Sequence, residues 1–161
     1  MAIKVGDRLP NAKFRVMSGG AAVWKTTDDI FKGKKVVIFA VPGAFTPTCT
    51  GNHLPGFVKN FAAIKAKGAD TIAVTSVNDL FVMEAWKNHV CPDTQIEFLA
   101  DGNGEFAKAI DMTLDASANG LGIRSKRYAM VVEDGVVKKF NIEDQPGKAE
   151  VSGADNLLKQ M

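Results

Sequence analysis

The sequence predicts an α/β fold in which helices flank a central mixed β-sheet that an N-terminal β-hairpin extends. Two continuous apolar runs, KKVVIFAV (34–41) and DTIAVTSV (70–77), are rich in β-branched residues and typical of strands buried on both faces. Segments with the apolar spacing of helices alternate with such runs. Near the C-terminus, Asp134-Gly135 between two alternating runs predicts a second hairpin.

The N-terminal half supplies the first elements. AKFRVM (12–17) and AAVWKT (21–26) are strand-like runs around a glycine turn, which predicts the N-terminal hairpin. The first buried run follows, and a helix is then expected to begin at Thr48 and to stop at Gly68. Pro55 should kink this helix because proline removes a backbone donor.

The second buried run precedes five further elements: a helix over 79–89, a strand over 96–101, a helix over 102–110, the hairpin over 127–143 and a short helix over 152–161. Ser152 is expected to cap the last helix. A βαβ unit followed by an antiparallel hairpin and a final helix is the thioredoxin-like layout. That layout supports many functions, so the function has to be argued from a site.

Composition restricts the class of protein. The 161 residues suit a single domain over 1–161 with a sizeable core, and 46% hydrophobic with 24% charged residues is ordinary for a folded chain. The net charge is +2, and the densest basic run, KGKK (32–35), favours a solvated turn over a nucleic-acid interface. Apolar stretches are too short for a membrane span or a signal core. We therefore expect a cytoplasmic protein, or one inside an organelle after removal of a transit peptide.

One of only two cysteines lies in PGAFTPTCTG (42–51), directly after the first buried run. Cys49 there begins the predicted helix, and both a helix N-terminus and a nearby cation favour the reactive thiolate form of cysteine. Two interpretations remain open at this point, an activated thiol and a small buried cysteine beside helix-capping threonines. Position 52 is Asn52, so there is no Cys-x-x-Cys pair and dithiol exchange is excluded at this site.

The pattern Pro42-x-x-x-Thr46-x-x-Cys49 resembles the active-site signature of peroxiredoxins. The longer run KKVVIFAVPGAFTPTCTGNHLPGF (34–57) is similar to the atypical subfamily called type II, or peroxiredoxin 5. The same holds for VTSVNDLFVMEAW (74–86) and RSKRYAMVVEDGVV (124–137). The resemblance therefore covers nearly the whole chain.

The resemblance implies a role for each matching residue. Cys49 would be the nucleophile that becomes a sulfenic acid as the peroxide O–O bond breaks. Thr46 would hydrogen-bond the peroxide and the sulfur, and Pro42 would limit water at the thiolate. Arg127 would lie beside the sulfur and stabilise charge on the leaving oxygen. Backbone N–H groups of Thr48 and Cys49 would complete the oxygen-binding site.

Two further residues are candidates with alternatives. His53 lies four residues after Cys49, where it either tunes the pocket or is a packed histidine. Cys91 is the other thiol, but it does not match the positions at which the family places a resolving cysteine. The resemblance therefore implies recycling by an external thiol, with glutathione or a glutaredoxin favoured over thioredoxin.

A zinc site is the rival use of the same residue types. Cys49, His53, His89 and Cys91 are all the cysteines and histidines of the chain, and together they offer the donor set of a Cys2His2 site. Their spacing differs from the usual zinc pairing, so a metal site is disfavoured. Arg124 is expected to be solvent-facing beside a lysine.

The sequence thus predicts a thiol peroxidase that reduces hydrogen peroxide and small organic hydroperoxides without metal, flavin, haem or nicotinamide. The resemblance also implies a homodimer, and Phe81, Met83 and Trp86 are expected in the core or at an interface. The alternative is a non-catalytic thioredoxin-like module whose reactive thiol serves redox sensing or partner binding.

Overall fold

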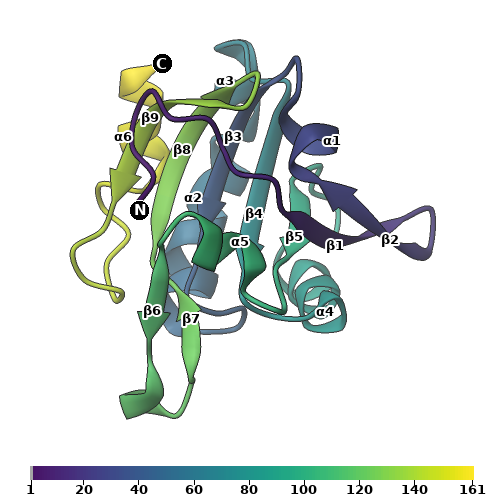
Figure 1. Cartoon of the computed structure of the whole chain (residues 1–161), viewed down its shortest axis with the longest axis vertical. Coiled ribbons are helices and arrows are strands. Elements are labelled where there is room, and N and C mark those ends of the chain that lie inside the picture. Colours follow the sequence, from purple (N-terminus) through teal and green to yellow (C-terminus); the bar gives the residue numbers. More distant parts are fainter. Residues whose placement is uncertain (1) are drawn as a thin grey trace.

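A computed structural model describes residues 2–161 and is built around a seven-stranded mixed sheet in the order β2-β1-β5-β4-β3-β8-β9 (Figure 1). The strands are β1 Lys13–Ser18, β2 Ala21–Thr26, β3 Lys35–Ala40, β4 Thr71–Ser76, β5 Glu97–Ala100, β6 Thr113–Asp115, β7 Ile123–Ser125, β8 Tyr128–Glu133 and β9 Val136–Ile142. The helices are α1 Thr27–Phe31, α2 Leu54–Lys59, α3 Phe61–Ala66, α4 Leu80–Val90, α5 Glu105–Ala109 and α6 Ala154–Gln160, with a π-helical turn η1 Cys49–His53 and a 3-10 turn η2 Ser117–Asn119. The predicted α/β fold is confirmed.

The two continuous apolar runs form the centre of the sheet, as predicted. β3 pairs in parallel with β4 and β4 with β5, whereas β8 pairs antiparallel with β3, and β9 with β8. Successive side chains of a strand point to opposite faces. Accordingly, Val37 and Phe39 belong to one buried cluster while Val36 and Ile38 belong to another. The sheet therefore has a hydrophobic core on each face.

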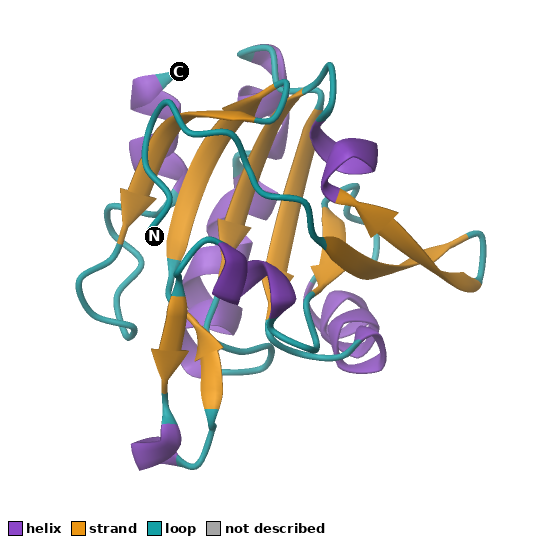
Figure 2. Cartoon of the chain, in the orientation of Figure 1, coloured by secondary structure: helices purple, strands orange, loops and turns teal. Residues whose placement is uncertain are grey.

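Helices from different parts of the chain cover the two faces (Figure 2). Side chains of α2, α3, α4 and α6 pack in the cluster that contains Phe39. Side chains of α1 and α5 pack in the other cluster, together with the N-terminal segment. The N-terminal hairpin β1–β2 continues the sheet beyond β5 and projects from the body of the molecule (Figure 1).

The helix expected from Thr48 to Gly68 is divided into three pieces. Its first turn, η1, is π-helical, so the Leu54 N–H donates to the Cys49 carbonyl five residues back. Pro55 consequently lies in the first turn of α2, where its missing N–H costs little. A second break separates α2 from α3 at Asn60, whose side-chain amide donates to the Gly56 carbonyl at 2.8 Å.

The small hairpin β6–β7 is an element that the sequence did not reveal. Its strands have three residues each and pair antiparallel, with η2 at the tip. The glycines of ANGLG (118–122) are typical of a turn, but three-residue strands are too short to show an alternating pattern. The hairpin hangs below the sheet in Figure 1, at the end where β3 leads into η1.

None of the helices within residues 2–161 combines the length and apolar character needed to cross a membrane.

Replacing Phe39 by Ala should lower the free energy of unfolding by about 3–5 kcal/mol, because the change opens a cavity in the core. The Phe39 ring is fully buried and stacks on Phe57 with 4.0 Å between ring centroids. Denaturant unfolding followed by far-ultraviolet circular dichroism measures the loss. Val5→Ala, at an exposed apolar residue, is the control and should shift stability by less than about 0.5 kcal/mol. Equal shifts in the two variants would contradict the assignment of Phe39 to the core.

Candidate active site

Cys49 lies at the start of η1, one short loop beyond the end of β3. The loop turns sharply, and Phe45 in it has a left-handed φ of 67°, which is uncommon for a residue with a side chain. Thr46 closes the turn, because both its N–H and its hydroxyl donate to the Gly43 carbonyl, at 3.4 and 2.7 Å. The Cys49 side chain is fully buried as a free thiol.

Arg127 reaches the same place from the start of β8. Because β8 pairs antiparallel with β3, with Ala40 opposite Tyr128, the residue before β8 lies beside the loop that follows β3. Arg127 Nη2 donates to Cys49 Sγ at 3.0 Å, although 78 residues separate the two in sequence. The predicted pairing of thiol and guanidinium is therefore confirmed.

His53 lies on the far side of the guanidinium. Arg127 Nη1 is 3.0 Å from His53 Nδ1, and His53 Nε2 is 2.9 Å from the Ser152 carbonyl oxygen. A guanidinium only donates and a carbonyl only accepts, so the hydrogen of the neutral imidazole must be on Nε2. His53 is thus a neutral acceptor that orients Arg127, rather than a second cation beside the sulfur.

The electrostatics of the site agree with this tautomer. Burial, and to a lesser degree the neighbouring Arg127 charge, together lower the pKa of His53 to about 3, against the opposing effect of the hydrogen bond to Ser152. A protonated imidazole would place a second buried cation against the guanidinium. The pocket therefore keeps one positive charge, on Arg127.

The segment between β9 and α6, residues 143–153, supplies main-chain acceptors and is called the C-terminal loop below. Its Pro146 carbonyl accepts a hydrogen bond from Arg127 Nε at 3.1 Å. Its Gly147 carbonyl accepts from the Thr48 hydroxyl at 2.9 Å. Together with Ser152, these carbonyls fix three side chains around the thiol.

Arg127 is 2% exposed and forms no ion pair in the part of the chain that the structure describes. Its hydrogen-bond partners are the Cys49 thiol, the His53 imidazole and the Pro146 carbonyl, none of which is a carboxylate. A buried cation without a counter-ion strongly favours an anion next to it. The arrangement therefore favours negative charge that develops next to the Arg127 guanidinium.

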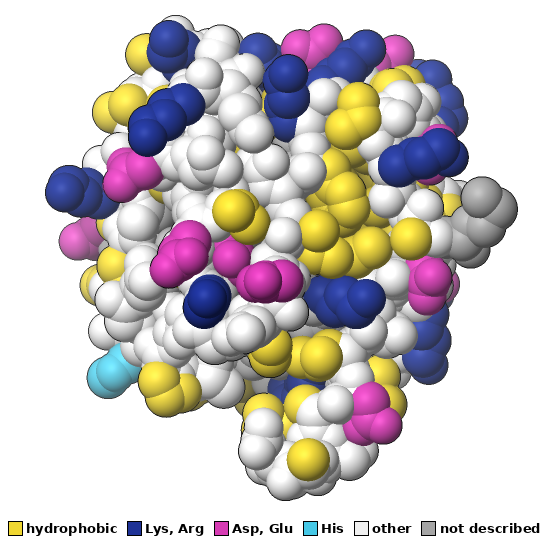
Figure 3. Space-filling model, turned by 90° about the vertical axis from the view of Figure 1, so that its left-hand side faces the viewer, with side chains coloured by type: hydrophobic (Ala, Val, Ile, Leu, Met, Phe, Trp, Pro, Cys, Tyr) yellow, Lys and Arg dark blue, Asp and Glu magenta, His cyan; other side chains and the backbone are white. Residues whose placement is uncertain are grey.

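A hollow of about 350 Å³ opens in front of this cluster. The active-site turn contributes Pro42, Thr46 and Thr48, and Arg127 forms part of the wall. The opposite wall is mainly apolar and comes from the hairpin β6–β7, with Leu114 and Leu121. Figure 3 shows hydrophobic side chains where this hairpin meets the body of the molecule.

Cys91 takes part in none of these contacts, and it is the C-cap residue of α4. It is a free, buried thiol, and burial raises its pKa, an effect that the Lys87 charge only partly opposes. Within residues 2–161, no three His, Cys, Asp or Glu side chains are grouped so as to hold a metal. His89, one of the donors of the zinc alternative, instead packs on the exposed Phe45 ring at 5.8 Å between centroids.

Arg124 corrects an expectation. It is half-buried rather than solvent-facing, and its guanidinium donates to the Leu121 and Val77 carbonyls, both at 2.9 Å. It thereby ties the hairpin β6–β7 to the residue that follows β4.

Asn78 is a residue of the site that sequence reasoning missed. Its side-chain oxygen accepts a hydrogen bond from the Ala44 N–H at 3.0 Å. For Asn78, the only signal in the sequence was its position two residues after the second buried run's strand, β4.

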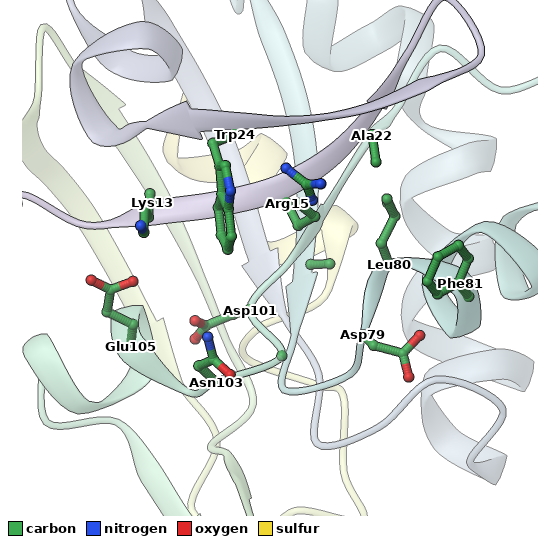
Figure 4. A pocket seen from close by; sticks show the side chains of 12 residues that line it. Lys13, Arg15, Ala22, Trp24, Asp79, Leu80, Phe81, Asp101, Asn103 and Glu105 are labelled. Atoms are coloured by element: carbon green, nitrogen blue, oxygen red, sulfur yellow. The ribbon is translucent and has the colours of Figure 1, made fainter.

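A second hollow, of about 250 Å³, lies far from the thiol between the N-terminal hairpin and α4 (Figure 4). The half-exposed Trp24 ring borders it, with Lys13 and Arg15 at 4.5 and 4.9 Å from the ring centroid. Phe81 lies at its edge and is 75% exposed, whereas Met83 and Trp86 are buried in the core. Cysteine, serine and histidine are missing from the residues that line this hollow, whereas the buried thiol of Cys49 lies at the first one.

The chain is similar to known proteins over nearly its whole length. The Redoxin family model matches residues 4–158. The chain is 44% identical to the chloroplastic Peroxiredoxin-2E of Arabidopsis thaliana over 164 residues, covering 99% of this chain and 70% of that protein. It superimposes on reduced Prx3 of Vibrio vulnificus in complex with hydrogen peroxide with a TM-score of 0.91, at 46% identity, over 98% and 95% of the two chains. For peroxiredoxin 5 of Alvinella pompejana the TM-score is 0.85, at 34% identity, over 98% and 96%.

The low pKa of His53 predicts a specific loss of stability in acid. Between pH 6.5 and about 3 the unfolded chain binds a proton at this residue and the folded chain does not. The free energy of unfolding should therefore fall by up to about 1.4 kcal/mol per pH unit as the pH decreases through this window. His53→Gln removes the titration and supplies a side-chain amide of similar reach. Denaturant midpoints measured across the window should show a shallower slope for the variant, and parallel curves would contradict the assignment.

Proposed function

Because the chain belongs to the peroxiredoxins, in the type II or peroxiredoxin 5-like group, we propose that Cys49 reduces both hydrogen peroxide and small organic hydroperoxides. The family is one of thiol peroxidases, and Cys49 is the peroxidatic residue engaged by Arg127. The observation that carries the proposal is the 3.0 Å contact between Arg127 Nη2 and Cys49 Sγ in a buried site.

The reaction begins with the thiolate that Arg127 stabilises. Cys49 Sγ attacks the nearer peroxide oxygen, an S–O bond forms and the O–O bond breaks. Cysteine is oxidised to the sulfenic acid, and the peroxide is reduced to an alkoxide or hydroxide that takes up a proton to leave as alcohol or water. The Arg127 charge favours this step because negative charge moves from sulfur to the leaving oxygen beside it.

The turn before Cys49 supplies the remaining contacts. The Thr46 hydroxyl, which donates to Gly43 in the resting site, is the group that hydrogen-bonds the bound peroxide. Thr50 N–H donates to the Thr46 carbonyl at 2.9 Å, whereas the N–H groups of Thr48 and Cys49 have no carbonyl partner among residues 2–161. These two N–H groups are donors for the peroxide oxygens. Buried Pro42 restricts water at the sulfur.

The hollow beside Arg127 supports the organic part of the substrate range. Hydrogen peroxide needs little more space than water, yet the hollow measures about 350 Å³ and its far wall carries Leu114 and Leu121. Apolar surface there favours a carbon chain on the leaving oxygen, through burial from water. The polar contacts stay at the peroxide group.

The sulfenic acid is returned to the thiol by an external thiol, with glutathione or a glutaredoxin as the favoured donor and thioredoxin as the second choice. One glutathione displaces water from the sulfenic acid to form a mixed disulfide, and a second glutathione attacks that disulfide to release oxidised glutathione and the Cys49 thiol. Cys91 fits an internal resolving role poorly, because it is buried and its raised pKa disfavours the attacking thiolate.

A cytoplasmic homodimer completes the proposal. Phe81 at the start of α4 is 75% exposed, and Phe45 in the active-site loop is 48% exposed. Large exposed aromatic side chains are common at protein–protein contacts. A dimer through this face places the active-site loop of each copy next to the contact. The alternative function, a non-catalytic redox-sensing module, predicts thiol oxidation without turnover.

Cys49→Ser should abolish peroxide consumption in the presence of any thiol donor, since the nucleophile is removed. Cys91→Ser should keep at least half of the glutathione- and glutaredoxin-dependent turnover, because the reductant attacks Cys49 directly. Steady-state consumption of hydrogen peroxide and of a tertiary alkyl hydroperoxide, with glutathione, glutaredoxin and thioredoxin systems in turn, measures both. Wild-type protein that is oxidised once but never turns over would instead favour the sensor. Loss of turnover in Cys91→Ser alone would overturn the proposed recycling.

Arg127→Ala should slow oxidation of Cys49 by about 10²–10³-fold, because the charge that stabilises the leaving oxygen is lost. The thiolate fraction at neutral pH, followed by its ultraviolet absorbance, should fall as well. Arg8→Ala is the matched control, since Arg8 donates to the Asp134 carbonyl at a remote turn. Stopped-flow mixing with hydrogen peroxide gives the rates. An Arg127→Ala rate within threefold of the Arg8→Ala rate would exclude the assigned role.

A further inference from the structure

A second layer of polar contacts lies behind the Arg127–His53 pair and ends at a buried carboxylate. Glu143, which follows β9, is 8% exposed, and its Oε2 accepts hydrogen bonds from both the N–H and the hydroxyl of Ser152, at 2.7 and 2.5 Å. Ser152 was expected to cap α6, but Gly153 is the N-cap and the Ser152 hydroxyl is directed to Glu143 instead. The sequence prediction for Ser152 is therefore wrong.

Ser152 connects this carboxylate to the active site. While its N–H and hydroxyl are held by Glu143, its carbonyl accepts from His53 Nε2 at 2.9 Å. The turn is tight, because an added Cβ on the next residue, Gly153, would lie 3.0 Å from the Ala149 carbonyl oxygen. The Ser152 carbonyl is thus set in position by the carboxylate on one side and by a compact turn on the other.

The position of that carbonyl decides what His53 presents to Arg127. With Nε2–H donated to Ser152, the Nδ1 lone pair faces Arg127 Nη1 at 3.0 Å. Without this acceptor, the ring could flip or take the other tautomer, and a donor would then oppose the guanidinium. A hollow of about 230 Å³ between α2 and the C-terminal loop is lined in part by His53.

The Glu143 carboxylate is linked to the Arg127 guanidinium only indirectly, through Ser152 and His53. Glu143 N–H donates to the Arg127 carbonyl at 3.0 Å, so the two residues are neighbours across β8 and β9. The Glu143 side chain nevertheless forms no ion pair with Arg127 within residues 2–161. A direct pair would satisfy the Arg127 charge, whereas the relay through Ser152 and neutral His53 leaves that charge for Cys49.

We propose that Glu143 is a positioning residue for the peroxidase reaction, which acts through Ser152 and His53 to hold Arg127 against Cys49. Loss of the carboxylate frees the Ser152 carbonyl and lets the His53 ring reorient. The Arg127 guanidinium then loses one of its fixed contacts, and displacement of a charge that must face the leaving oxygen slows the reaction. Glu143 contacts neither the sulfur nor the peroxide, so it is not a catalytic residue.

The test is a double-mutant cycle with stopped-flow oxidation of Cys49 by hydrogen peroxide. Glu143→Ala should slow oxidation about tenfold. In a His53→Ala background the same change should have less than a twofold effect, because the relay is already broken. Asp144→Ala, at the exposed neighbouring carboxylate, is the matched control and should match wild type within twofold. Equal losses in both backgrounds, or a wild-type rate for Glu143→Ala, would overturn the proposal.

Two further measurements keep the test independent of folding. Glu143→Gln keeps an oxygen acceptor for Ser152 and should recover at least half of the wild-type rate even where Glu143→Ala is unstable. Nitrogen NMR shifts of the His53 ring report the tautomer directly. We expect a single Nε2–H form in wild type and Glu143→Gln, and a mixed population in Glu143→Ala or Ser152→Gly. A His53 ring that keeps one tautomer in every variant would show that Glu143 has only a structural role.

Discussion

The burial of Arg127 without a counter-ion is the constraint on which the rest of the site depends. Removal of a guanidinium from water carries a large desolvation cost, which an ion pair or several hydrogen bonds must offset. Here three uncharged acceptors share the task, two from the ends of η1 and one from the C-terminal loop. Each of these segments must be in place for the cation to remain buried, so the site and the fold around it are coupled.

That coupling requires three segments that are distant in sequence to meet at this point. The thiol follows β3, the guanidinium precedes β8, and the carbonyl acceptors come from the last loop before α6. β3 and β8 are neighbours in the sheet, which brings the first two together. α6 packs in the same core cluster as α2, which brings the loop before α6 to the same corner. Topology, rather than sequence proximity, builds the site.

Much of the fold was accessible from the sequence because strong patterns encode it. The apolar runs of β3 and β4 and the Asp134-Gly135 turn each have one dominant structural interpretation. Cys49 and Arg127 were found through a resemblance to peroxiredoxins. The hairpin β6–β7 was missed because its strands are too short for a pattern. The π-helical turn was missed because periodicity does not distinguish it from an α-helical turn.

The acceptors of the site were inaccessible for a different reason. Pro146, Gly147 and Ser152 contribute main-chain carbonyls, and every residue has one, so side-chain identity carries no signal for this use. Arg124 was misjudged because a lysine nearby in sequence indicated solvent, while its two carbonyl partners come from the end of β4 and from the hairpin β6–β7. Such contacts become visible only once the strands are placed.

The complete burial of Cys49 has a kinetic consequence. A sulfur with no exposed surface reacts only when its surroundings move, and the extent of that movement depends on the reagent. Hydrogen peroxide, or the peroxide end of an organic hydroperoxide that lies in the hollow beside Arg127, needs an opening about as wide as a water molecule. A reducing thiol must bring its own sulfur within bonding distance and carry its chain along, so it needs a wider opening. The wall around Cys49 therefore discriminates by size between the oxidant and the reductant.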